Sequence, residues 1–239
     1  MPWNQRKALL THHRWFRNLV DFHHMTRGWV EEATSEREAH QMERAPSPEM
    51  IDDIKLLDAL PDARLDTLLD DTDPSDLLAR LEYSVWAVQA WTYTSLTGRI
   101  SGTEKEKLNS VLEQSVWKQG RAAAEKRWHH AEKQTRGNFS EDLRSLFLTL
   151  IDSPVALNLG EDAFLLRRGL IRELEFEFRA CPHHSRYPEV IPVANELCFF
   201  HSAWIRGYIY GLNHQVQIEY HPTQASQAKS GGCSQHWKL

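Results

Sequence analysis

The sequence lacks the features that mark secreted, membrane-spanning and nucleic-acid-binding proteins. It has three cysteines in 239 residues, an odd number, and its first residues contain no apolar signal region. We therefore expect reduced thiols and a cytoplasmic location. No stretch approaches the roughly 18 uncharged apolar residues that a membrane span requires. The formal net charge is −5 and no basic face is evident, which argues against binding to nucleic acid.

Several familiar catalytic motifs are also missing. The chain has no Walker phosphate loop, no dinucleotide glycine fingerprint, no His-Glu-x-x-His zinc motif and no Gly-x-Ser-x-Gly nucleophile elbow. With 41% hydrophobic residues it is long enough to bury a large core without disulfides. The partner that we expect is a small-molecule substrate, with a protein partner or a second copy of the chain left open.

Helical patterns dominate the first two thirds of the chain. Apolar residues recur there at helical spacing, and capping residues mark several helix starts. Gly120 and the alanines that follow it are small enough to let another backbone approach one of these helices closely. The predicted helices are 3–33, 76–97, 103–133 and 143–151, with a short acidic helical piece before residue 70.

The pattern changes to a mixture of strands and one helix near the C-terminus. Residues 174–179 and 216–220 alternate apolar and polar side chains, which is typical of strands with one face in solvent. A helix is predicted over 189–212 and a last strand over 233–239. The sequence thus predicts an α+β chain in which N-terminal helices precede a small antiparallel sheet packed against helices. The expected domains are a helical extension, 1–100, and an α+β domain, 101–239.

All three cysteines lie in this last part of the chain, and each is followed three residues later by a histidine. A cysteine is the one strong nucleophile at neutral pH that needs little more than a lowered pKa. Residues three apart share a helix face but lie on opposite faces of a strand, so the second pair is expected to meet and the third is not. The pairs are Cys181 with His184, Cys198 with His201, and Cys233 with His236.

Three motifs in this region resemble the L-2-amino-thiazoline-4-carboxylic acid hydrolase family. They are Arg179-Ala-Cys-Pro182 after a strand, Glu196-Leu-Cys198 within a helix, and Lys229-Ser-Gly-Gly-Cys-Ser-Gln-His-Trp237 at the end of the sheet. The helix from Glu104 to Lys133 is similar to the helix that opens that family's domain. The resemblance covers about residues 104–239. It implies an α+β domain and, for the named member, hydrolytic opening of a thiazoline ring.

The leading hypothesis is a hydrolase-like domain that acts on a small C=N or C–N substrate, such as a cyclic amidine or a thiazoline, without a cofactor. Cys181 is the expected reactive thiol, and Cys198 is its neighbour in the pocket. His201 would act as general base or keep a thiolate charged. His183 or His184 would protonate the departing nitrogen.

Two alternatives from other classes stay open at this point. In the first, the domain binds a small ligand or a metal without turnover, and Cys181, Cys198 and His201 hold zinc or iron as soft ligands. In the second, the chain is an accessory protein whose tryptophan-bearing N-terminal helices dock on a partner, because aromatic residues are enriched at interfaces.

Overall fold

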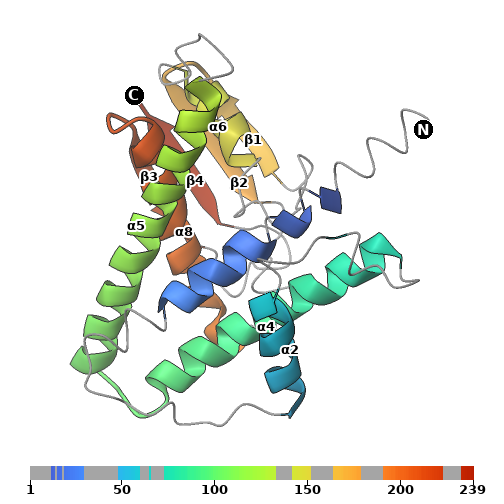
Figure 1. The fold of residues 1–239 in the computed structure, drawn as a ribbon. Helices are drawn as coiled ribbons and strands as arrows, with labels where there is room; N and C mark the ends of the chain where they lie inside the picture. The colour runs from blue at the N-terminus through green and yellow to red at the C-terminus, as the bar shows by residue number, and fades with distance from the viewer. Residues whose placement is uncertain are drawn as a thin grey trace. The chain divides into compact units, whose positions relative to one another are not determined.

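The structure is a computed structural model of the chain (Figure 1). The chain divides into two compact units, Met1–Ile100 and Ser101–Leu239. The described part of the first unit is helical, and the second combines helices with a sheet, so the α+β class is confirmed. The residues that the structure describes are 12–13, 15–17, 19–29, 48–59, 65, 73–132, 142–151, 164–178, 191–222 and 233–239. Of the helices in these ranges, none has the length and apolar character needed to cross a membrane.

The core of the N-terminal unit forms where α4 (Pro74–Thr97) packs against the helix that contains Phe22 and Thr26. The Phe22 and Trp86 rings lie 5.3 Å apart between centroids. One turn further along both helices, Gln89 Nε2 donates to Thr26 Oγ1 at 3.2 Å. All four residues are buried, so this interface combines apolar packing with a buried side-chain hydrogen bond.

A second polar contact ties α2 (Pro48–Ala59) to the same N-terminal helix. His23 Nε2 lies 2.8 Å from Asp58 Oδ1, and an Arg27 guanidinium nitrogen lies 2.7 Å from Asp58 Oδ2. His23 is buried, and this burial lowers its pKa below the ordinary value although Asp58 acts in the opposite direction. The neutral ring therefore donates one N–H to the carboxylate.

In the C-terminal unit, α5 (Thr103–Glu132) and α8 (Ala194–Leu212) lie side by side (Figure 1). A Cβ placed on Gly120 would overlap the carbonyl oxygen of Trp204 and lie 3.0 Å from the backbone nitrogen of Tyr208. The expected close approach of a backbone at Gly120 is thus confirmed, and the approaching helix is α8.

Gly207 has the same function on the opposite helix. A Cβ at this position would overlap the carbonyl oxygen of Trp117 on α5. An ion pair also joins the two helices: a guanidinium nitrogen of Arg206 on α8 lies 2.7 Å from a carboxylate oxygen of Glu113 on α5. The two helices therefore touch backbone to backbone, which larger side chains on either helix would prevent.

The described residues of the same unit form a four-stranded antiparallel sheet in the order β1-β2-β4-β3. Alternate residues of β2 and β4 are buried on one face, among them Phe176 and Trp237. Helix α6 (Leu143–Ile151) packs on this face, with the Phe147 and Phe176 rings 4.8 Å apart between centroids. The strands are β1 (Phe164–Gly169), β2 (Glu173–Phe178), β3 (Gln217–His221) and β4 (Ser234–Lys238).

Most predicted elements of the C-terminal unit agree with the structure to within a few residues. The helix expected over 189–212 begins later, because Ile191–Val193 forms a short 3-10 helix, η5, around Pro192 before α8 starts. Proline has no N–H to donate, so it fits the start of a helix better than its interior. Strand β1 was not predicted. In its sequence, Phe-Leu-Leu-Arg-Arg-Gly, two leucines are followed by two arginines, so apolar and polar residues do not alternate.

Candidate functional site

Two thiols and one phenol meet in the C-terminal unit. Cys198 Sγ on α8 lies 2.7 Å from the Tyr220 hydroxyl on β3, and Cys233 also hydrogen-bonds to this hydroxyl. Neither of these two cysteines is in a disulfide. They are buried, with exposed fractions of 4% for Cys198 and 6% for Cys233. We call Cys198, Tyr220 and Cys233 the thiol–tyrosine cluster.

The register of the sheet explains why Cys233 reaches Tyr220. Tyr220 lies opposite Gln235 in the β3–β4 pair, and Cys233 is two residues before Gln235 on the same face. Such diagonal neighbours are within reach of an aromatic side chain. The Cys233 carbonyl accepts a 3.0 Å hydrogen bond from the Phe178 N–H of β2, which holds the backbone at this thiol in place.

Tyr220 is held in its neutral form. Burial raises its pKa well above the usual range for a tyrosine, and the two neighbouring thiols, Cys233 and Cys198, raise it further. A neutral phenol keeps its proton and can donate a hydrogen bond. The cluster thus offers a sulfur nucleophile and a fixed O–H donor beside it, which is a useful pair for addition to a polarised double bond.

His201 lies one turn after Cys198 on α8, as predicted, and is buried. Burial lowers its pKa to about 3, so the imidazole is neutral at physiological pH. A neutral ring can accept a proton, but it does not supply the positive charge needed to hold a thiolate. Tyr220, a residue that the sequence interpretation did not include, is in contact with Cys198.

The other predicted site residues lie outside the described residues: Cys181, His183 and His184 are not among them. The proposed metal ligand set included Cys181, so it too is only partly described. Within the described ranges, no group of three or more His, Cys, Asp or Glu side chains is arranged to hold a metal ion.

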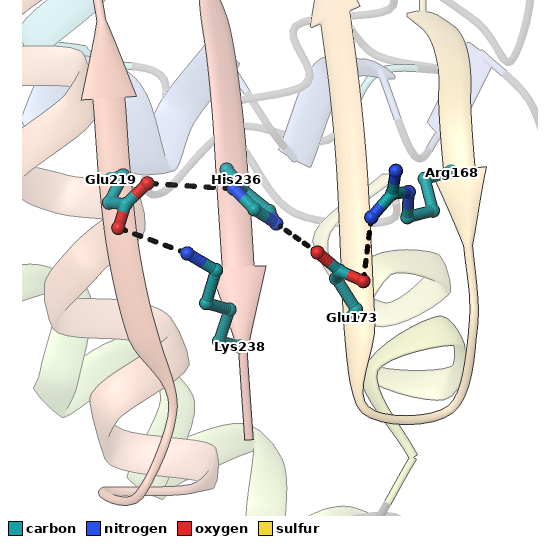
Figure 2. A network of polar contacts seen from close by, with 5 residues as sticks. All are labelled: Arg168, Glu173, Glu219, His236 and Lys238. Atoms are coloured by element: carbon teal, nitrogen blue, oxygen red, sulfur yellow. Dashed lines mark hydrogen bonds and ion pairs between the residues drawn. The ribbon is translucent and has the colours of Figure 1, made fainter.

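His236 points away from Cys233, as predicted for residues three apart on a strand. Cys233 is buried, whereas His236 lies on the opposite, half-exposed face of the sheet. Its two ring nitrogens face two carboxylates: Nε2 lies 2.9 Å from Glu173 Oε1, and Nδ1 lies 3.5 Å from Glu219 Oε2 (Figure 2). This histidine therefore belongs to a different network from the thiols.

The network of Figure 2 crosses all four strands. Arg168 of β1 binds Glu173 of β2 at 2.8 Å, and Lys238 of β4 binds Glu219 of β3 at 3.2 Å, with His236 between the two carboxylates. The Arg168 hydrogen bond, followed by that of His236, lowers the pKa of Glu173, and Lys238 is the main cause of the lowered pKa of Glu219. These charges are mutually compensated, as expected of a structural ladder.

Comparison with known proteins gave no match: no family model, no curated protein and no solved structure corresponds to this chain.

Proposed function

We propose that the C-terminal unit is a hydrolase-like domain that acts on a small C=N substrate of the cyclic amidine type through the thiol–tyrosine cluster. The observation that carries this proposal is the 2.7 Å contact between Cys198 Sγ and the Tyr220 hydroxyl. The family resemblance, which rests on the flanks of the three cysteines, supports the same substrate class. Among the described residues, Cys198 is the nucleophile in this proposal.

The first step is addition of the Cys198 thiol to the amidine carbon. A carbon–sulfur bond forms, the C=N π bond breaks, and the nitrogen gains the thiol proton, with the Tyr220 hydroxyl donating a hydrogen bond to it. Because Tyr220 is neutral and fixed beside the sulfur, its O–H needs no reorganisation as negative charge develops on nitrogen. His201 has no role in this step, because a ring with a pKa of about 3 is too weak a base to take a proton from a thiol.

The second step expels the ring amine. Its carbon–nitrogen bond breaks, a proton moves from the remaining amino group to the leaving nitrogen, and a thioimidate on Cys198 is left. Water then attacks the thioimidate carbon, the carbon–sulfur bond breaks, and the thiol recovers its proton. The balance is one amidine and one water consumed, one amide and one amine formed. No oxidant or cofactor enters this balance.

The test is turnover of a panel of cyclic amidines and thiazolines by the full chain and its variants. Cys198→Ser should abolish measurable turnover. Tyr220→Phe, which removes the donor and keeps the ring, should lower kcat roughly a hundredfold. Tyr210→Phe is the matched control, because Tyr210 is an exposed tyrosine on α8 and should leave kcat unchanged. Full activity of Cys198→Ser on a substrate that the wild type hydrolyses would remove the proposal.

A fourth variant separates the two thiols that the sequence considered. If Cys181→Ser loses turnover while Cys198→Ser keeps it, the nucleophile is Cys181 and the mechanism above is wrong in its first step. If both lose turnover, Cys181 contributes to the same pocket as Cys198.

A further inference from the structure

The thiol–tyrosine cluster contains a second thiol for which the hydrolytic reaction has no use. Cys233 lies directly before β4, and Cys198 lies near the start of α8, 35 residues earlier in the sequence. Both sulfurs hydrogen-bond to one oxygen, Tyr220 Oη, so they are no more than roughly 7 Å apart. Rotation of each side chain about its Cα–Cβ bond can move the two sulfurs closer together.

We infer that Cys198 and Cys233 form a peroxide-sensitive dithiol, which a hydroperoxide converts into a Cys198–Cys233 disulfide that links α8 to β4. This inference names a mode of regulation for the proposed site, but the oxidation itself does not require that site to be catalytic. Neither cysteine is bonded to another in the structure, so the reduced form is the one described.

The chemistry has two steps that balance. The Cys198 thiolate attacks one oxygen of the hydroperoxide, the O–O bond breaks, and a sulfenic acid and an alcohol or water are formed. Cys233 then attacks the Cys198 sulfur, the S–O bond breaks, and water leaves. Two thiols are oxidised by two electrons in total, and one peroxide is reduced.

Burial decides the fate of the sulfenic acid. With exposed fractions of 4% and 6%, neither sulfur offers the surface that glutathione, a flexible tripeptide, needs for contact, whereas a hydroperoxide or a single small ring needs much less. Among the described residues the thiol that can reach an oxidised Cys198 is Cys233, so we expect the internal disulfide in preference to a mixed one with glutathione. Once Cys198 is ionised its sulfur can only accept a hydrogen bond, so the neutral Tyr220 hydroxyl beside it donates and stabilises the thiolate that begins the reaction.

The experiment uses full-length Cys181→Ser protein, in which Cys198 and Cys233 are the two remaining cysteines. After treatment with hydrogen peroxide and alkylation of free thiols, the intact mass should show the loss of two hydrogen atoms and no alkylation. Peptide mapping should recover a cross-link between the two cysteine-bearing peptides that dithiothreitol reverses. The control Cys181→Ser/Cys233→Ser should give no such cross-link and should trap dimedone at Cys198.

Alkylation of both thiols after peroxide treatment, with the far-UV circular dichroism unchanged, would overturn the inference. So would a map in which glutathione, added with the peroxide, caps Cys198 in place of Cys233. If Cys181→Ser does not fold, the map of the oxidised wild type decides, and exclusive pairing of Cys198 with Cys181 counts against the inference. Substrate turnover is measured separately on reduced protein, so failure of the hydrolase proposal is distinguishable from failure of this one.

Discussion

Replacing Gly207 by alanine tests the backbone contact between α5 and α8. In an exposed helix the same change stabilises by about 0.5–1 kcal/mol, because alanine loses less backbone entropy on folding. At Gly207 the new Cβ would overlap the Trp117 carbonyl oxygen, which is backbone and cannot rotate away. The helices must separate, and overpacking of this kind costs about 1–3 kcal/mol. We therefore expect a net loss of roughly 1–2 kcal/mol, since the overpacking exceeds the propensity gain.

Calorimetry of the full chain measures this loss. For a chain of this size each kcal/mol lowers Tm by about 2–4 °C, so Gly207→Ala should lower the Tm of the C-terminal unit by roughly 2–8 °C. The matched control is Ser110→Ala on the exposed face of α5, where the stability should change by less than about 0.5 kcal/mol. A Gly207→Ala protein as stable as the wild type, or more stable, would refute the contact between the two backbones.

Three further outcomes follow from the titrating groups. Arg168 and His236 lower the pKa of Glu173 below its ordinary 4.5, so the contribution of Glu173 to stability is present above pH 4.5 and is lost on acidification. Glu173→Gln should therefore reduce the loss of stability at acidic pH, measured by urea unfolding across a pH series. His201, with a pKa of about 3, should keep the NMR shifts of a neutral ring down to about pH 4, and an imidazolium signal near pH 6 would contradict its burial. Asp58→Asn keeps the side-chain volume but removes the negative charge that contacts both Arg27 and His23. It should lower the free energy of unfolding of the N-terminal unit by roughly 1–3 kcal/mol at pH 7. Asp52→Asn, at an exposed position on α2, is the control.

Helices and strands could be predicted from the sequence where one pattern of apolar and polar residues continued over five or more residues. The run 174–178 alternates strictly, and its glutamates lie on the half-exposed face of β2 while its apolar residues are buried. Helix α6 begins and ends at the predicted residues 143 and 151. Strand β1 escaped prediction because its two leucines and two arginines stand in pairs, so its sequence carries no period of two.

The candidate site was harder to predict because its contacts depend on register. The alternation of apolar and polar residues places Tyr220 and Ile218 on one face of β3 and Cys233 on the buried face of the sheet at β4. It does not determine which residues of the two strands lie opposite one another. That choice brings Tyr220 to Cys233, and the packing of α8 then brings Cys198 to the same hydroxyl. The helical spacing of Cys198 and His201 suggested a local partner, but no local spacing could indicate the tertiary contact of Cys198 with Tyr220.

The strand order also determines when the complete sheet can form during synthesis. β4 is the last strand along the chain, yet it lies between β2 and β3 and supplies Trp237 to the core. During synthesis β2 and β3 are translated before the strand that joins them, so neither has its full set of hydrogen bonds until residues 234–238 follow. The thiol–tyrosine cluster can therefore assemble only after residues 233–238 have been translated, and the Cys198 thiol, which is made 35 residues earlier, lacks both cluster partners for part of that time.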